Sequence, residues 1–330
     1  MTRKTWVLVI ASILVSSTLL EVHVFAAGER KKIVMVSNSA AFVLLQEVLQ
    51  NPLNGINVVH TLPMIYALAI ELSPNQTDAE LLNLLLGISG AQVYDDLRVS
   101  VLPITKSPDG VVFLTQDMYA WGLMRIGADV AHQKMPDWTG KGVQVAIVDT
   151  GVGDTAIVGC THPDLPLIVV GFNALPGGGS YCDRHGHGTH MAGIIAARAN
   201  KRGLIGVAPE AGIVAVKVLD DNGKGFLSNV LYGLQWIYDN QSQKQLWLVN
   251  MSLGFSADSP ALLQATQHLS DSGTLIVAST GNRCSDDPGQ DEGAGADGEG
   301  PTCDTPQTTD IKYPANYPWV LAVAATDDAK

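Results

Sequence analysis

Two short blocks of this sequence carry side chains that could do chemistry together. Residues 146–151 form an apolar run that ends on a carboxylate, Asp149, followed by Thr-Gly. Residues 185–193 read as a glycine-rich turn that leads into a helix and carries imidazoles at its start. An Asp that orients a His, with a nucleophile later in the chain, is an arrangement that activates a hydroxyl for acyl transfer. Asp149 and His187 are therefore candidate catalytic residues.

These side chains need rigid elements to position them, and the sequence from Gly142 onward predicts such a frame. Apolar runs of buried-strand length alternate there with stretches of helical periodicity. The predicted strands are residues 143–148, 212–219, 247–250, 274–278 and 320–324, and the predicted helices are 188–199, 228–240 and 260–270. Ser228 is the predicted N-cap of the second helix.

This alternation predicts a doubly wound parallel sheet with helices on both faces, so the fold class is α/β. In such sheets the working groups gather at the carboxyl ends of the strands. Three polar side chains follow predicted strands in this way: Asp149, Asn250 and Asn282.

The N-terminal residues 1–27 have the organisation of a secretion signal. Two basic residues precede an apolar run from Trp6 to Leu20, and small residues suited to cleavage follow. The run is shorter than the roughly 20 residues that a membrane-spanning helix needs. We therefore expect a secreted, extracellular protein without a stable membrane anchor.

The pattern of residues 28–115 predicts a small, separate α+β domain, which precedes a larger domain at 116–330. A capping box, Thr-x-x-Glu, opens its second helix at Thr77. The expected order is strand 32–37, helix 40–50, strands 55–62 and 66–72, helix 77–86 and strand 92–102, with a linker over 104–118. This β-α-β-β-α-β order is that of the ferredoxin-like split unit.

Composition restricts the choice of partners. The formal net charge is −12, whereas nucleic-acid binding requires a basic surface, so we expect no nucleic-acid partner. Seven acidic residues lie in the Gly-rich stretch 284–304. We interpret this stretch as a solvated loop, and a weak cation site is the alternative.

The four cysteines become informative once export is expected, because disulfides form in oxidising compartments. Three pairings are possible for four cysteines. We favour Cys160 with Cys182 and Cys284 with Cys303, since each bond closes one local stretch. Free buried thiols are the alternative.

Several blocks, in order, resemble the subtilisin-like serine proteases, the subtilase family. They are residues 145–151, 187–193, Gly-Val-Ala-Pro at 206–209, Asn-Met-Ser-Leu-Gly at 250–254, Thr-Gly-Asn at 280–282 and Tyr-Pro-Ala-Asn-Tyr-Pro at 313–318. The resemblance covers roughly residues 117–330. It implies a subtilisin-like fold and an endopeptidase that hydrolyses polypeptide substrates.

The resemblance implies a role for each catalytic candidate. Asp149 would orient the imidazole, His187 would be the general base, and Asn282 would donate to the oxyanion. The neighbouring His185 and His190 would be structural. A zinc site built from the three histidines is the alternative, but their spacing is not that of a helical zinc motif.

The resemblance also identifies two segments that would bind an extended substrate backbone by strand addition. One is Gly223, Lys224 and Gly225, and the other is Ser252, Leu253 and Gly254. Ser252 is a stray candidate for the nucleophile, but its counterpart in the family lines the pocket. We therefore do not assign it a catalytic role.

Calcium is the cofactor that the resemblance implies. Asp164 and Asn200, joined by Asp117, match the positions where the family holds a structural calcium ion, and hard oxygen ligands suit that ion. An ordinary turn and helix end are the alternative interpretation. Residues 152–161 lengthen the loop before Asp164, which departs from the family pattern.

Residues 28–115 resemble, more loosely, the inhibitor-type propeptide of the family. This implies a zymogen whose own propeptide assists folding and then occupies the cleft as an intramolecular inhibitor. The alternative is an unrelated small domain. We also expect a monomer.

The third member of the triad is missing, because no Gly-Thr-Ser-Met-Ala-like block occurs in the 330 residues. We therefore expect a fragment whose serine lies beyond Lys330, and no activity from these residues alone. The rival hypothesis is a shortened, inactive subtilase-like protein that binds peptides or inhibits proteases.

Overall fold

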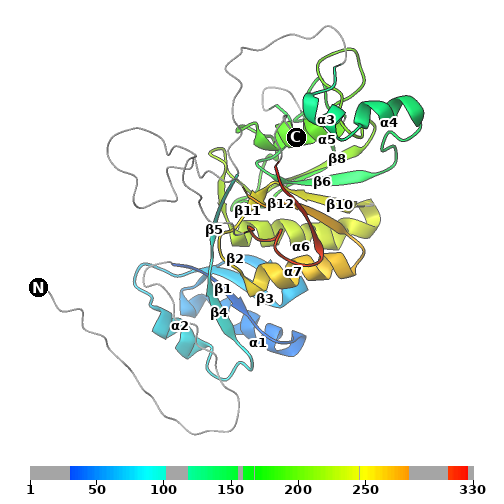
Figure 1. Ribbon diagram of the computed structural model, residues 1–330. Helices are drawn as coiled ribbons and strands as arrows, with labels where there is room; N and C mark the ends of the chain where they lie inside the picture. The colour runs from blue at the N-terminus through cyan, green and yellow to red at the C-terminus, as the bar shows by residue number, and fades with distance from the viewer. Residues whose placement is uncertain are drawn as a thin grey trace, which may run out of the picture.

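The computed structural model describes residues 30–101, 118–154, 159–166, 168–244, 246–281 and 311–325, without the side chains of 242–247. Two units lie one above the other, and a strand runs from the lower unit up into the other (Figure 1). The expected secretion signal, most of the linker and the acidic stretch 284–304 lie outside the described residues.

The lower unit is a four-stranded antiparallel sheet with two helices, in the order β-α-β-β-α-β that the sequence predicts. Its sheet order is β2-β3-β1-β4. Its elements are β1 (Lys31–Met35), α1 (Ser39–Leu49), β2 (Asn57–Leu62), β3 (Ala67–Glu71), α2 (Asp78–Leu84) and β4 (Gln92–Asp95). The capping box is present: Thr77 Oγ1 accepts from the Glu80 N–H, and Glu80 accepts from the Thr77 N–H.

The expectation of one continuous strand over 92–102 is wrong, because the chain changes sheets at Asp96. Residues after β4 continue as β5 (Arg98–Val101), which belongs to another sheet. Asp96 is buried, and its carboxylate accepts from the Ser228 N–H at 2.8 Å and from the Ser228 hydroxyl at 2.6 Å. These bonds tie the point where the chain leaves the first sheet to the start of α6 in the other unit.

The upper unit is built on a six-stranded parallel sheet of order β13-β12-β10-β6-β8-β7. Its strands are β6 (Gln144–Asp149), β7 (Ile168–Asn173), β8 (Gly212–Lys217), β10 (Leu246–Met251), β12 (Leu275–Ser279) and β13 (Val320–Val323). Its helices are α3 (Trp121–Arg125), α4 (Ala128–Lys134), α5 (His187–Ala196), α6 (Leu227–Lys244) and α7 (Pro260–Asp271). The five predicted strands are present, and the edge strand β7 is one that the sequence analysis missed.

Alternate residues of β6 explain why helices cover both faces of this sheet. Val145 and Ile147 lie in an apolar cluster with Ala192 of α5. Ala146 and Val148 point to the other face, into the cluster that contains Leu234 of α6. The predicted α/β fold class, a doubly wound parallel sheet, is confirmed.

Helices α6 and α7 lie between the two sheets, with the lower unit against their far side (Figure 1). Apolar residues of the lower sheet, such as Ile33 and Leu62, share one buried cluster with Leu234 of α6 and Leu262 of α7. The N–H of Met64 also donates to the Gln235 side chain at 2.7 Å. The two units are therefore packed together through a continuous apolar core.

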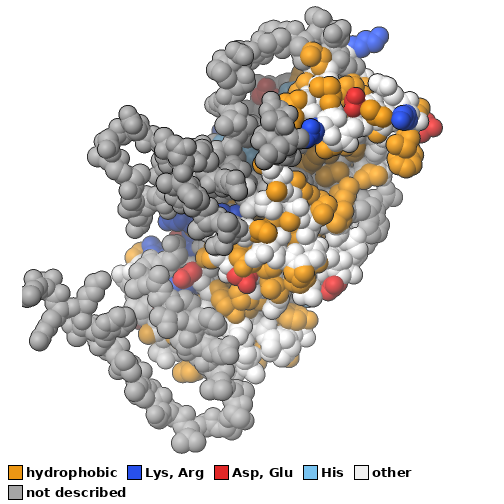
Figure 2. Space-filling model, viewed as in Figure 1, with side chains coloured by type: hydrophobic (Ala, Val, Ile, Leu, Met, Phe, Trp, Pro, Cys, Tyr) orange, Lys and Arg blue, Asp and Glu red, His pale blue; other side chains and the backbone are white. Residues whose placement is uncertain are grey.

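Apolar side chains also gather on the outer surface of the upper unit (Figure 2). Around α3 and α4 the most exposed are Ile126 and Trp138. None of the helices in the described part of the chain has both the length and the apolar character that crossing a bilayer requires.

Candidate active site

Asp149 and His187 form a buried pair at the carboxyl edge of the parallel sheet. Asp149 is the last residue of β6 and His187 is the first residue of α5. Nδ1 of His187 lies 2.8 Å from each carboxylate oxygen of Asp149, and the two residues are 3% and 0% exposed. The carboxylate therefore accepts a hydrogen bond from the Nδ1–H group, which leaves Nε2 unprotonated as the basic atom of the ring.

Two glycines allow these segments to approach so closely. A Cβ at Gly188, the residue after His187, would collide with the Gly151 carbonyl oxygen and lie 3.1 Å from the Asp149 Cβ. Gly151 has a φ of +108°, a conformation that residues with a side chain rarely adopt. The glycines of both sequence blocks thus bring α5 against the end of β6.

The two predicted substrate-binding segments lie on either side of β5. The three-stranded sheet has the order β11-β5-β9, where β9 is Lys224–Phe226 and β11 is Leu253–Gly254. Both pairings are antiparallel. Gly223 belongs to the same edge, since its carbonyl accepts from the Val101 N–H at 2.9 Å. A strand of the N-terminal unit thus occupies the place between the two segments.

Ser252 lies immediately before β11, and its hydroxyl accepts a hydrogen bond from the Asn250 side chain at 3.0 Å. Asn250 is in β10, next to β6 in the sheet. This contact is consistent with a structural role for Ser252 in holding β11.

Asn282, the expected oxyanion donor, lies just outside the described residues, as do Cys284 and Cys303. The described chain reaches Gly281, two residues after β12 ends at Ser279. Because β12 and β10 are parallel neighbours, and β10 pairs with β6, the carboxyl end of β12 lies at the same sheet edge as Asp149.

The expected calcium ligands Asp164 and Asn200 lie in neighbouring segments, because the Arg198 N–H donates to the Asp164 carbonyl at 2.8 Å. Oδ1 of each side chain is buried and has no hydrogen-bond partner among the described residues. Two orphaned oxygens fit a hard cation such as calcium. Asp117 lies outside the described residues, and no group of three or more His, Cys, Asp or Glu suited to a metal occurs among those described.

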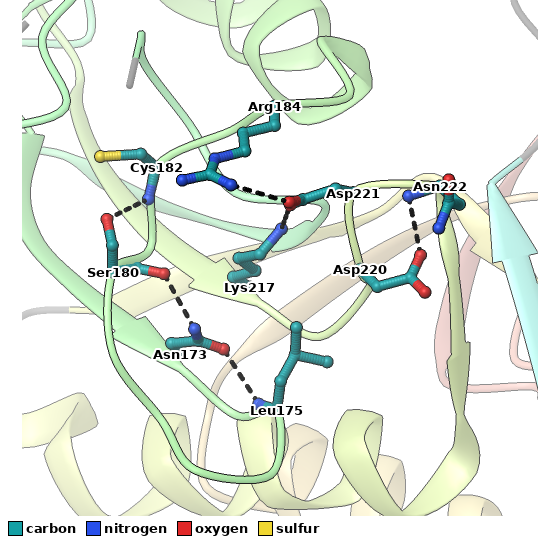
Figure 3. A pocket seen from close by; sticks show the side chains of 9 residues that line it. All are labelled: Asn173, Leu175, Ser180, Cys182, Arg184, Lys217, Asp220, Asp221 and Asn222. Atoms are coloured by element: carbon teal, nitrogen blue, oxygen red, sulfur yellow. Dashed lines mark hydrogen bonds and ion pairs between the residues drawn. The ribbon is translucent and has the colours of Figure 1, made fainter. Parts of the chain in front are cut away.

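A polar hollow opens at the same edge of the sheet, and its side chains come from the ends of β7 and β8, the segment before α5 and the loop after β8 (Figure 3). Lys217 is buried there, and its ammonium donates to the Thr150 carbonyl at 2.6 Å and to Asp221 at 3.2 Å. Arg184 pairs with the same Asp221 at 3.5 Å. Asp221 thus bridges the two cationic side chains, and Lys217 ties the loop after β8 to the residue that follows Asp149.

The predicted disulfide between Cys160 and Cys182 is present, with Cα atoms 5.0 Å apart. Its second cysteine directly precedes Asp183. Two residues that the sequence analysis missed, Thr150 and Asp183, lie buried between Asp149 and His187 in the chain. A sequence signal existed, since an Asp shortly before a glycine-rich helix start is suited to accept from free N–H groups.

Comparison with known proteins identifies clear relatives. A model described as the subtilase family matches residues 140–330. An alkaline protease of Alkalihalobacillus alcalophilus is 36% identical over 272 residues, which are 82% of this chain and 57% of that protein. Subtilisin Savinase of Lederbergia lenta is 40% identical over 207 residues, 63% of each chain.

A third relative, the minor extracellular protease Epr of Bacillus subtilis, is 39% identical over 190 residues, or 58% of this chain and 24% of that protein. The chain spans little more than half the length of the alkaline protease that it matches.

Proposed function

The chain belongs to the subtilase family, and we propose that it is part of the precursor of a secreted serine endopeptidase. The observation that carries this proposal is the buried pair in which Nδ1 of His187 lies 2.8 Å from both oxygens of Asp149. A carboxylate in that position fixes the imidazole tautomer with Nε2 unprotonated, as a general base requires.

In the proposed reaction, Nε2 of His187 removes the proton of a serine hydroxyl as its oxygen attacks the peptide carbonyl. Asp149 stabilises the imidazolium that forms, and the imidazolium then protonates the leaving amine. A water molecule then attacks the acyl-enzyme in the same way: Nε2 of His187 removes its proton and returns it to the serine oxygen as the acyl product leaves. The serine would come from outside these 330 residues, which contain no Gly-Thr-Ser-Met-Ala-like block.

The oxyanion would accept a hydrogen bond from the Asn282 amide, a type of donor worth about 2.7–4 kcal/mol in the transition state. That magnitude was measured on a subtilisin. The carboxyl end of β12, which precedes Asn282 in the chain, lies at the sheet edge that carries Asp149, and this supports the role.

The substrate would bind as an extended strand between β9 and β11. Its main chain would then form hydrogen bonds with the main-chain groups of both strands. β5 occupies that place in this chain and pairs with both strands. We therefore propose that residues 28–115 are a propeptide that blocks the cleft and helps the upper unit to fold. The β5 ladder and the shared apolar core support both roles.

The proposal includes a structural calcium ion held by Asp164 and Asn200, with Asp117 as a further ligand. Calcium would supply a fixed positive charge that joins the loop before β7 to the segment after α5. The orphaned oxygens Asp164 Oδ1 and Asn200 Oδ1 support this assignment. We further propose export by residues 1–27 and action as a monomer.

The test uses the longer protein, with the sequence that follows these 330 residues in its gene. It should cleave peptide substrates and react with a serine-directed fluorophosphonate, and His187→Ala should abolish both reactions. Ser252→Ala should still be labelled. Labelling that maps to Ser252 would overturn the assignment of the nucleophile. A longer protein without any labelling would favour the rival, an inactive peptide-binding or inhibitory subtilase-like protein.

A further inference from the structure

Asp183 lies where the segments that carry Asp149 and His187 meet. It is 7% exposed and follows Cys182, four residues before His187. Its N–H donates to the Gly153 carbonyl at 3.0 Å, which fixes it against the loop that follows Asp149. Its backbone is therefore held beside the candidate pair, although its side chain touches neither member in the described contacts.

The carboxylate of Asp183 accepts five hydrogen bonds. Oδ1 accepts from the Thr150 hydroxyl at 2.9 Å and from the N–H groups of His185 and Gly186 at 2.9 and 2.8 Å. Oδ2 accepts from the N–H and the hydroxyl of Thr189 at 2.9 and 2.7 Å. Three of the donors are backbone N–H groups around the start of α5, which His187 begins.

Thr150 completes a connection between the two catalytic candidates. It directly follows Asp149 and is fully buried. Its hydroxyl donates to Asp183 and accepts from the Gly188 N–H at 3.0 Å. One hydroxyl thus bonds both to the carboxylate that holds the turn before His187 and to the residue after His187.

The charge of Asp183 suits this position. Burial by itself would raise the pKa of the carboxyl, but the hydrogen bonds from Thr189, Gly186 and Thr150 hold that pKa below its ordinary value. The group is therefore an acceptor throughout the neutral range. An anion at the start of a helix is also favoured by the helix dipole.

We propose that Asp183, acting through Thr150 and the first turn of α5, is a positioning residue that sets the Asp149–His187 hydrogen bond. It holds the two chain segments in one geometry and takes no part in proton transfer. This inference rests on the proposed function for its effect on catalysis. Its effect on the geometry of His187 does not require a functioning protease.

The test compares four variants of the longer protein. Asp183→Asn places an NH₂ group opposite the hydrogen-bond donors of Thr189 or of the turn, so that two donors face each other. Thr150→Val removes the bridging hydroxyl, and Thr150→Ser keeps it. Thr266→Val is the matched control, because Thr266 is equally buried, in α7, and its hydroxyl bonds to Leu262 and Trp319. It removes a buried hydroxyl without touching the pair.

Asp183→Asn and Thr150→Val should lower kcat about 100-fold with KM nearly unchanged. A displaced His187 is badly placed for proton transfer in the transition state, whereas the groups that bind the substrate are not moved. Thr150→Ser and Thr266→Val should keep kcat within about 3-fold of the parent, an allowance for small shifts of position. If Thr150 had a purely structural role, activity would fall only as far as the stability of the fold falls. Thr266→Val would then lower kcat as much as Thr150→Val does.

The second measurement is the proton NMR signal of His187 Nδ1 in the 330-residue chain. Asp183→Asn and Thr150→Val should move or broaden this signal, and Thr150→Ser and Thr266→Val should retain it. If Asp183→Asn does not fold, the Thr150→Val and Thr150→Ser pair decides. An unchanged signal and kcat in folded Asp183→Asn and Thr150→Val would overturn the inference. Absence of activity in the parent would instead overturn the proposed function, while the NMR signal still tests Asp183.

Discussion

The Val101 N–H donates to the Gly223 carbonyl at 2.9 Å, one step beyond the ladder in which β5 pairs with β9. On its other side, Val101 pairs with Leu253 of β11. An N-terminal strand therefore satisfies the main-chain groups of both edges that we assign to substrate. Val99 of β5, which pairs with Gly225 of β9, is 2% exposed, so its side chain is buried in the core that the two units share.

The first prediction concerns inhibition by residues 28–115 supplied as a separate chain. This chain should inhibit the mature enzyme, and Val99→Asp should weaken inhibition about 10- to 100-fold, because it forfeits the burial of a Val side chain and adds an uncompensated charge. Leu53→Asp, at a side chain that is 91% exposed, is the control and should inhibit normally. The measurement is a titration of peptide hydrolysis, with folding of each peptide checked by circular dichroism. Equal inhibition by Val99→Asp would contradict the placement of β5 in the cleft.

A second prediction concerns pH and His60, which is buried at the contact between β2 and α6. Its ring stacks on Tyr232 with centroids 4.3 Å apart, and Nε2 lies 3.3 Å from the Asn229 side-chain nitrogen. Burial, and then the nearby charge of Lys31, lowers the pKa of His60 from 6.5 to about 4. The unfolded chain therefore binds the proton more readily than the folded chain between these pH values.

The free energy of unfolding should consequently fall as pH drops from 6.5 towards 4, by on the order of 3 kcal/mol from this group. Urea unfolding of the His187→Ala protein, which cannot digest itself, measures this at pH 7 and pH 4.5. His60→Gln should reduce the difference between the two pH values. His268→Gln, at an exposed position of α7, should leave this difference unchanged. An equal difference in unfolding free energy between the two pH values for both variants would contradict the assignment.

A third prediction concerns calcium. If Asp164 and Asn200 hold the ion, calcium at about 100 times its Kd should stabilise the folded state by about 2.7 kcal/mol. Thermal melts with calcium and with chelator should then differ, and Asp164→Ala should shrink the difference. The exposed Asp137→Ala is the control and should retain it. Identical melting temperatures in the two media would contradict the assignment of a calcium site.

How far the sequence predicts this molecule depends on how local each signal is. The parallel strands and the two catalytic candidates follow from nearby residues, since buried runs and their polar ends lie within one segment. The strand over 92–102 is interrupted by a distant partner, as Asp96 bonds to Ser228. The same contact overturns the prediction of Ser228 as an N-cap, because its hydroxyl donates to Asp96 and the residue lies inside α6.

The missed residues show the same limit. β7 contains Gly171, which interrupts a strand pattern, and only the structure shows why: a Cβ there would collide with the Tyr181 ring. The place of Asp183 before a glycine-rich helix start predicts bonds to local N–H groups, but its bond to Thr150, which is distant in the sequence, is visible only in the structure. Periodicity cannot reveal a contact whose partners belong to different elements.

The last prediction separates two glycines of α5. Gly188→Ala should lower kcat/KM about 100-fold or more, because the added Cβ would collide with the Gly151 carbonyl and push His187 away from Asp149. Gly193→Ala is the matched control: apart from the neighbouring residues and the backbone of its own helix, no atom lies within 4 Å of its Cβ position, and Ala in a helix gains about 0.5–1 kcal/mol over Gly. Peptide hydrolysis and urea midpoints of both variants measure this. Full activity in Gly188→Ala would mean that the approach of α5 to β6 does not set the catalytic geometry.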